Sequence, residues 1–288
     1  MQVTRIRLYP VKSFSGLDVD AAGVLPWGLE GDRRWAVVDP DGEPVTAREV
    51  NGMLGLSATL DDGALVLSDG RHGSELRVPE PVGAAPIRVG HSRQGSALPA
   101  DAAADAWLSD RLGRPVRLVW QPDPRVRPVN PAHGGHPDDR VSLADVGPLL
   151  LASESSTAQL NRWTDDGTPE LDIVRFRPNV VVDGDPASPF AEDSWPFVQL
   201  GDVRFRVNGV CDRCVMTTID PDTLARGKEP IRNAREAPPL ERQDVVRGVA
   251  RARPGVLRVA GGDPRGRRRR RRLSARARCV SACARPRG

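Results

Sequence analysis

The chain has 288 residues, a net charge of +4 and four cysteines. This length can bury a sizeable core in one large domain or two joined smaller ones. No apolar run approaches the roughly 20 residues that span a bilayer, and the first residues lack the apolar core of a secretory signal. So few cysteines exclude a disulfide framework and favour a ligand or nucleophile in a reducing compartment. We therefore expect a cytoplasmic protein that does not contact a membrane.

The positive charge is concentrated at the C-terminal end. Residues 256–288 carry 12 arginines and one acid, Asp263, a local charge of +11 that leaves −7 on residues 1–255. This segment has almost no apolar residue able to pack, so it cannot offset the entropy lost on folding. We expect a disordered Arg-rich tail on an acidic body. Nonspecific, salt-sensitive nucleic-acid binding by the tail stays an alternative, and specific binding is not expected.

The first ninety residues indicate short strands separated by turns. Turn sequences at Asp39–Gly42 and Asp69–Gly70 separate apolar or alternating stretches. The expected strands are Thr4–Tyr9, Trp35–Val38, a strand at Val45, Ala64–Leu67 and Leu76–Val78. This half is expected to be barrel-like.

From Asp101 the apolar spacing becomes helical and ends at Gly113, a residue typical of helix C-termini. A strand is expected at Val116–Trp120, followed by a proline-rich loop over residues 121–139.

The second half indicates another β-rich unit. Ser155 or Ser156 can cap a helix that runs through Leu160 and Trp163. Strands are then expected at Val180–Val182 and Val203–Val207.

The strongest chemical motif is Cys211-Asp212-Arg213-Cys214, followed by Val-Met-Thr-Thr-Ile-Asp-Pro-Asp-Thr. Alone, such a Cys-x-x-Cys pair is half of a zinc site, a redox pair or two buried cysteines. Zinc needs a second pair, and the other two cysteines lie in the tail at a looser spacing. A thioredoxin-like pair needs a strand and a helix around it, a pattern absent here.

Cys-x-Arg-Cys followed by two threonines and Asp-Pro-Asp-Thr resembles the MOSC family, which includes the amidoxime-reducing components. The resemblance continues in the same order at Tyr9–Ser13, Gly31–Trp35, Ser153–Ser156, Phe176–Asn179 and Lys228–Pro230. It implies that Cys214 ligates molybdenum and that Cys211 is accessory. The neighbouring cation of Arg213 would help to keep the Cys214 thiol deprotonated.

The resemblance also implies a phosphate-bearing pterin, the molybdenum cofactor, bound where cations and donors converge. The residues expected to bind it are Lys12, Ser13, Arg33, Ser156, Arg177, Asn179 and Arg213. Taken singly, they have simpler interpretations: surface ion pairs for the arginines at 33 and 177, a turn for the asparagine and a helix cap for the serine. Only their joint order favours a site.

The predicted fold class is mainly β with a few helices (α+β). We expect a MOSC N-terminal β-barrel-like domain over residues 1–115, a MOSC β-barrel domain over 116–255 and the tail over 256–288. The resemblance fades after about residue 235, and the stretch from Ala237 to Ala250 lacks the aromatic strand expected of relatives. We interpret part of this terminus as translated out of frame, which predicts an open barrel behind Cys214 with unpaired backbone groups.

Two functions are compatible with the resemblance. The first is a molybdenum-dependent oxidoreductase that reduces N-hydroxylated compounds. Because the chain lacks the cysteines of an iron–sulfur domain, its electrons would come from a separate reductase. The second is a carrier of sulfur or cofactor that uses a Cys214 persulfide or a bound cofactor. The amino-terminal β unit, which is found in the reductase branch, favours the first function.

Overall fold

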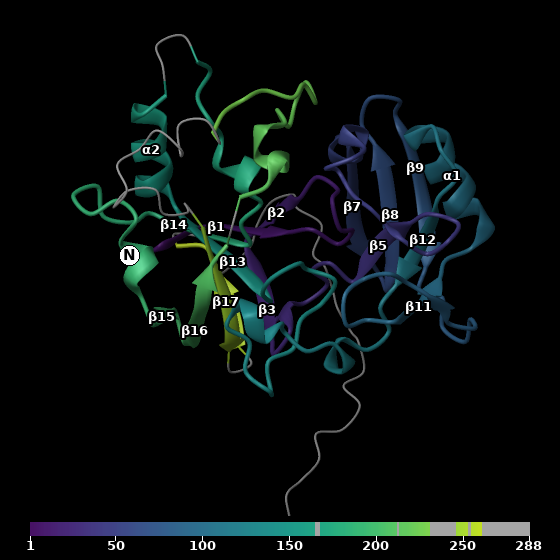
Figure 1. Cartoon of the computed structure of the whole chain (residues 1–288), viewed down its shortest axis with the longest axis horizontal. Helices are drawn as coiled ribbons and strands as arrows, with labels where there is room; N and C mark the ends of the chain where they lie inside the picture. Colours follow the sequence, from purple (N-terminus) through teal and green to yellow (C-terminus); the bar gives the residue numbers. More distant parts are fainter. Residues whose placement is uncertain (165–167, 212, 231–245, 253–254, 261–288) are drawn as a thin grey trace, which may run out of the picture.

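The computed structural model describes residues 1–164, 168–211, 213–230, 246–252 and 255–260. These residues form two β-rich halves and two α-helices (Figure 1). The predicted fold class, mainly β with a few helices, is confirmed. Among the described residues, no helix is both long and apolar enough to cross a bilayer.

The larger half is built on a seven-stranded sheet in which only β13 and β14 run parallel. In spatial order the strands are β15 (Phe197–Leu200), β16 (Val203–Val210), β17 (Val246–Ala252), β13 (Leu149–Ser153), β14 (Val180–Val182), β1 (Val3–Leu8) and β2 (Leu17–Val19). A three-stranded sheet shares its core and consists of β18 (Gly255–Arg258), β3 (Ala21–Leu25) and β4 (Gly28–Leu29). All three residues of β14 are buried, as an apolar run in an inner strand predicts.

The smaller half contains a five-stranded and a three-stranded sheet around one core. The first consists of β10 (Ile87–Arg88), β11 (Ser96–Pro99), β12 (Arg117–Trp120), β5 (Trp35–Val38) and β6 (Pro44–Val45), and the second of β7 (Leu56–Asp61), β8 (Ala64–Asp69) and β9 (Ser74–Pro79). Helix α1 (Ala102–Leu112) packs on this core through Ala104 and Leu108.

The two α-helices begin at side-chain caps. Asp101 accepts the N–H of Ala104 at the start of α1, and Gly113 ends this helix in the left-handed conformation, as predicted. Helix α2 (Glu154–Arg162) is capped by Ser153, so the prediction of Ser155 or Ser156 as the cap is wrong. Ser153 has an extended backbone and its hydroxyl accepts the N–H of Ser156, which already lies in the first turn. The 3-10 helices are Asn51–Gly55, Pro124–Val126, Pro131–His133, Ile173–Phe176, Ala191–Ser194 and Val215–Thr218.

The halves exchange strands. Strands β1 to β4, from the first thirty residues, belong to the sheets of the larger half, whereas β12 pairs with β5 in the smaller half. The halves therefore differ from the predicted division at residue 115, because β1 to β4 precede this residue but lie in the larger half, and β12 follows it but lies in the smaller half. The chain crosses between them several times, and the crossing segments border the cavity described below.

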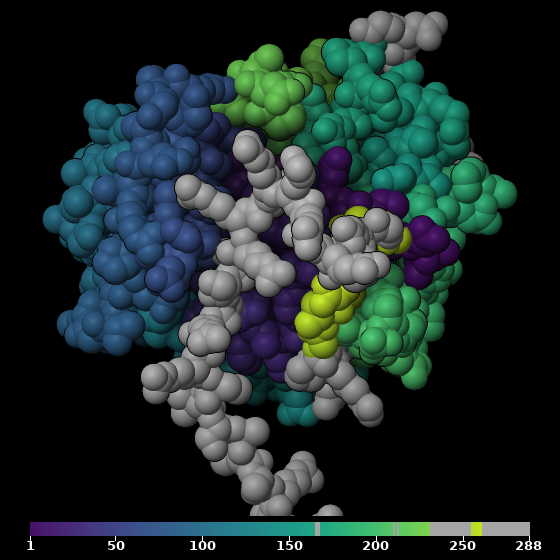
Figure 2. Space-filling view, turned by 180° about the vertical axis from the view of Figure 1, so that it is seen from behind, coloured from purple at the N-terminus to yellow at the C-terminus, as the bar shows by residue number. Residues whose placement is uncertain are grey.

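The C-terminal strands correct two predictions. Strand β17 lies between β13 and β16 and pairs with both, so the backbone groups at this place in the sheet are not unpaired as predicted, although the strand has no aromatic residue. Strand β18 pairs with β3 and buries Leu257, so residues 256–260 belong to the folded part and not to the tail. Figure 2 shows residues 255–260 in yellow, between the purple N-terminal segment and green residues of the larger half. The rest of the predicted tail, 261–288, and residues 231–245 lie outside the described residues.

Candidate functional site

A cavity of about 300 Å³ lies where the two halves meet. We call it the site cavity. Most of its wall comes from the segments that follow β1, β4, β6 and β16. The 3-10 helix Ile173–Phe176, with the residues directly after it, and the residues before β13 supply the rest. Its lining residues are Lys12, Ser13, Arg33, Arg48, Ala144, Asp145, Val146, Gly147, Leu150, Arg175, Phe176, Arg177, Asn179, Cys211, Arg213, Cys214, Met216 and Thr217.

Lys12 and Ser13 lie on a segment that crosses from β1 to the smaller half. Val11 and Phe14, on either side of them, are fully buried in the core of that half. The N–H of Lys12 donates to the carbonyl of Trp35 at 2.8 Å and fixes the segment against β5. Because their apolar neighbours are anchored in the core, the two polar side chains are held at the wall of the cavity.

The ammonium group of Lys12 is buried and bound. It donates to the carbonyl of Leu143 at 2.8 Å and forms an ion pair with Asp145. Burial lowers the pKa of Lys12, although Asp145 acts to raise it. The carboxylate of Asp145 is 63% exposed, and the nearby ammonium outweighs burial and lowers the pKa of Asp145 to about 2. Asp145 is therefore charged at neutral pH, and its ion pair favours the charged form of Lys12.

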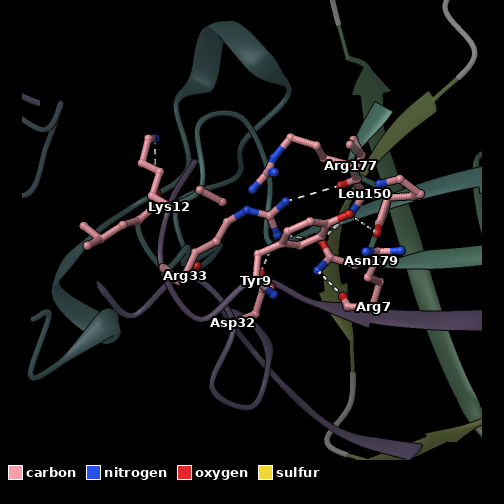
Figure 3. Close-up of polar contacts among 12 residues, drawn as sticks. Arg7, Tyr9, Lys12, Asp32, Arg33, Leu150, Arg177 and Asn179 are labelled. Atoms are coloured by element: carbon pink, nitrogen blue, oxygen red, sulfur yellow. Dashed lines mark hydrogen bonds and ion pairs between the residues drawn. The ribbon is translucent and has the colours of Figure 1, made fainter. Parts of the chain in front are cut away.

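Arg33 is held by a fully buried carboxylate. Its Nη1 lies 2.5 Å from Oδ2 of Asp32 and donates to Oδ1 of Asn179 at 2.9 Å. The attraction of Asp32 outweighs burial and raises the pKa of Arg33. Asn179 also donates to the carbonyl of Arg7 at 3.1 Å, so its amide ties three segments together (Figure 3). Asn179 is thus a cross-link behind the arginine and not a simple turn residue.

Arg177 completes this group. Its Nη1 donates to the carbonyl of Phe14 at 2.7 Å, and its Nη2 is buried without a hydrogen-bond partner. Burial lowers the pKa of Arg177 to about 10, which still leaves it charged at neutral pH. We call Lys12, Arg33, Arg177 and Asn179, with Asp32 behind them, the cationic end of the cavity.

Three of these lining residues have an unusual backbone. Ser13, Arg33 and Arg177 have φ angles of 69°, 48° and 56°, in the left-handed region that residues with a Cβ seldom adopt. Such conformations cost about 1 to 3 kcal/mol each and concentrate at functional sites, because the surrounding structure must enforce them. Their gathering around one cavity is independent support for a site there.

Cys214 also lines the cavity and lies just before the 3-10 helix Val215–Thr218. Its side chain is exposed, while its carbonyl accepts the N–H and the hydroxyl of Thr217 at 3.1 and 3.0 Å. Arg213 donates to the carbonyls of Cys211 at 2.7 Å and Phe176 at 3.3 Å, and its Nη2 is buried without a partner. We call Cys211, Arg213 and Cys214 the cysteine end. The effect of Arg213 on the thiol stays a prediction.

Two family models match the chain: the MOSC N-terminal beta barrel domain over residues 1–115 and the MOSC domain over residues 138–264. The chain belongs to the MOSC family. Mitochondrial amidoxime-reducing component 1 of Homo sapiens is 33% identical over 84% of this chain and 74% of its own length. The Mus musculus protein of the same name is 34% identical over 80% of this chain and 69% of its own length.

The MOSC family also includes a longer relative. The molybdenum cofactor sulfurase of Danio rerio is 29% identical over 81% of this chain, a region that makes up 30% of that protein. A match this long must include part of the N-terminal β unit. The presence of that unit therefore does not separate a reductase from a sulfurase, and the argument that it favours the reductase is wrong.

The lining of this MOSC cavity has the donor set that a phosphate-bearing pterin requires. Lys12, Arg33 and Arg177 place three cations on one wall, and the buried N–H of Arg177 lacks a partner within the protein. The lining also contains an exposed cysteine, whose thiol is a soft ligand suited to molybdenum. A volume of about 300 Å³ is at the lower bound of ordinary small-molecule sites.

Ser156 is the one predicted site residue that the structure does not bring to the cavity. Its side chain is fully buried, and its hydroxyl donates to Glu192 at 2.6 Å and accepts the N–H of Phe190 at 2.8 Å. The hydroxyl of Ser153 donates to the same carboxylate at 2.9 Å. Ser153 and Ser156 therefore hold the start of α2 against the 3-10 helix Ala191–Ser194, and neither hydroxyl is left for a ligand.

The structure adds residues to the predicted site. Asp145 pairs with Lys12, and no motif marks it in the sequence. Asp32 belongs to the Gly31–Trp35 motif, and its carboxylate holds Arg33. Arg48 also lines the cavity without a motif around it, whereas Thr217 is one of the two threonines of the cysteine motif.

Proposed function

We propose that this MOSC protein is a molybdenum-cofactor oxidoreductase that reduces N-hydroxylated compounds with electrons from a separate reductase. The observation that carries the proposal is one cavity whose lining contains both a fixed group of cations and an exposed cysteine. The names of the relatives, amidoxime-reducing component and molybdenum cofactor sulfurase, support molybdenum chemistry. Cytoplasmic localisation stays a prediction.

In this proposal the two ends have different tasks. Lys12, Arg33 and Arg177 bind the phosphate group, because guanidinium and ammonium donors form short, strong hydrogen bonds to phosphate oxygens. Cys214 supplies the thiolate ligand to molybdenum. When bound, the cofactor provides a metal that exchanges two electrons, and the protein provides binding, orientation and electrostatics.

The substrate must approach the cysteine end, since that is where the side chain is exposed. Reduction of an N-hydroxylated compound to its amine consumes two electrons and two protons and releases water. With Cys214 reserved for molybdenum, three cysteines remain in this sequence, one fewer than a cluster held by four cysteines needs. The electrons would therefore arrive from another protein that reaches this exposed end.

A second function is favoured by one specific observation. Cys214 is exposed and not enclosed by the cavity wall, which would also suit a persulfide that must be handed to an acceptor. In that case the protein would be a carrier of sulfur or of cofactor. The likeness to molybdenum cofactor sulfurase over most of the chain is compatible with this role.

The experiment that tests the first function compares the molybdenum and pterin content of the purified protein with that of Cys214→Ala. We expect about one molybdenum per chain in the wild type and its loss in the variant. Cys211→Ala is the matched control, because Cys211 shares the motif but is expected to be accessory, and it should retain the metal.

If Cys214→Ala retains the pterin but loses molybdenum, the result agrees with cations that bind the phosphate group independently of the cysteine thiolate. Absence of both metal and pterin from wild-type protein made in a cofactor-replete host would contradict the oxidoreductase. Labelling of a Cys214 persulfide in that same protein would then support the carrier.

A further inference from the structure

Tyr9 is the only tyrosine of the chain, and it lies fully buried behind the cationic end. The guanidinium carbon of Arg33 lies 4.5 Å from the centroid of its ring, and that of Arg177 lies 4.2 Å away. Figure 3 shows both guanidinium groups turned toward the ring. One aromatic side chain thus contacts two of the three cations that line this wall.

The remaining polar groups of Tyr9 bind the same two segments. Its N–H donates to Oδ1 of Asp32 at 2.8 Å, and its carbonyl accepts the N–H of Arg33 at 2.8 Å. Its hydroxyl donates at 3.1 Å to the carbonyl of Pro178, the residue directly after Arg177. Tyr9 therefore contacts both arginines through its ring and anchors the backbone beside each of them.

The two arginines need such a partner because they lack sufficient negative charge. Asp32 is engaged with Arg33, and among the described residues Arg177 has no ion pair with a carboxylate. Two like charges near one another repel, and the face of an aromatic ring attracts each cation through its quadrupole. The ring stabilises both cations without neutralising them, which leaves their full charge available to an anion.

Close packing fixes the ring itself. A Cβ at Gly16 would lie 2.5 Å from Cε1 of Tyr9 and 2.7 Å from Nε of Arg7, so only glycine fits there. The ring therefore lies close beside Gly16, with its hydroxyl bonded to Pro178 and two guanidinium groups against it.

We infer that Tyr9 is the positioning residue of the cationic end: its ring holds Arg33 and Arg177 in one arrangement that fits a doubly charged oxyanion, such as a phosphate ester. The inference rests on the proposed function only for the identity of the anion. The arrangement of the two arginines is a property of the chain itself.

The first experiment measures the order of the two arginine side chains by NMR of their guanidinium groups in the full chain. Their signals are assigned from Arg33→Lys and Arg177→Lys. We compare wild type, Tyr9→Phe and Tyr9→Leu. Phenylalanine keeps the aromatic face and leucine does not, so both arginines should stay ordered in Tyr9→Phe and become mobile in Tyr9→Leu. Equal order in all three proteins would overturn the inference.

The second experiment measures binding of inorganic phosphate to the cofactor-free full chain. We expect Tyr9→Leu to weaken the affinity about tenfold, which corresponds to the loss of two cation–π contacts, and Tyr9→Phe to stay within about threefold of wild type. If Tyr9→Phe loses as much as Tyr9→Leu, the hydroxyl bond to Pro178 does the positioning and the ring does not.

A third protein tests the inference even if Tyr9→Leu does not fold. Because the chain has one tyrosine, growth on 3,5-difluorotyrosine changes this ring alone and reduces its attraction for cations while keeping its shape. At mildly acidic pH, where the hydroxyl stays protonated, the arginine signals should lose order and phosphate should bind more weakly. Unchanged signals and affinity would contradict the inference. If the arginines respond but phosphate binds to none of the proteins, Tyr9 positions the arginines, but their fit to an oxyanion is overturned and the proposed cofactor site loses support.

Discussion

At the cationic end of the site cavity the functional groups are buried and bound to the protein, whereas at the cysteine end the reactive atom is exposed. Arg33 is fixed by Asp32 and Asn179, and all three are buried. Cys214 contributes only its carbonyl to the local turn. The difference indicates that one end is preorganised for a group that stays in place, and the other is open to groups that come and go.

The largest expected effect concerns the carboxylate behind the cationic end. Asp32→Asn should lower the free energy of unfolding by about 3 to 5 kcal/mol, because it leaves Arg33 charged and buried without its counter-ion. Urea denaturation at neutral pH measures this. Asp61→Asn is the control, since Asp61 and its partner Arg77 are both about half exposed and their pair should contribute at most about 1 kcal/mol. Similar losses in both variants would contradict the comparison.

A pH-dependent effect should come from His91, a buried residue close to the cationic end. Both of its ring nitrogens lack hydrogen-bond partners, and burial, with Lys12 and Arg127 nearby, lowers the pKa of His91 to about 3, against a small raising effect of Asp145. Between pH 6.5 and 4 the unfolded chain binds a proton that the folded chain does not. Stability is therefore fully present above pH 6.5 and falls by about 3 kcal/mol as the pH drops to 4.

The test compares the free energy of unfolding of wild type and His91→Leu across this window. Other groups titrate too, so the informative quantity is the free energy of unfolding of the wild type minus that of His91→Leu, which should fall by about 3 kcal/mol between pH 6.5 and 4. His133→Gln, at an exposed histidine, should follow the wild type. A difference that does not change with pH would show that His91 is not held neutral.

The smallest expected effect is at the cysteine end. Thr217→Val removes the hydroxyl that donates to the carbonyl of Cys214 at 3.0 Å and should cost about 1 kcal/mol of stability. We also expect alkylation of Cys214, followed by mass spectrometry, to become about threefold faster, a change equivalent to less than 1 kcal/mol. Thr218→Val is the matched control, because its hydroxyl donates to Val215 instead, at 2.8 Å. Equal alkylation rates in the two variants would mean that the turn does not restrain the cysteine.

Some elements were predictable because one local signal decides them. Strand β14 is a run of three valines in an inner strand, and α1 has an aspartate at its start and a glycine at its end. The cap of α2 was misjudged because three serines in four positions can all cap a helix, and only the backbone conformation selects Ser153. Strand β18 was assigned to the tail because arginines dominate the composition around a single buried leucine.

The candidate site was predictable to the level of its motifs but not of its contacts. Motif order brought Lys12, Arg33, Arg177 and Cys214 into consideration, and the structure lines one cavity with them. The sequence does not show that Tyr9 packs on both arginines, because ring contacts depend on segments that are far apart in the chain. It also does not show positive φ angles, since serine and arginine do not predict them as glycine does.

The pairing of β18 with β3 has a consequence for how the protein is made. Gly255 pairs with Val24, so one of the last described strands completes a sheet begun by one of the first. During synthesis the N-terminal strands must wait for nearly the whole chain to leave the ribosome before this partner is available. Contacts between such distant positions form late and slowly. The N-terminal segment that carries Lys12 therefore lies beside an incomplete sheet until β18 has been synthesised.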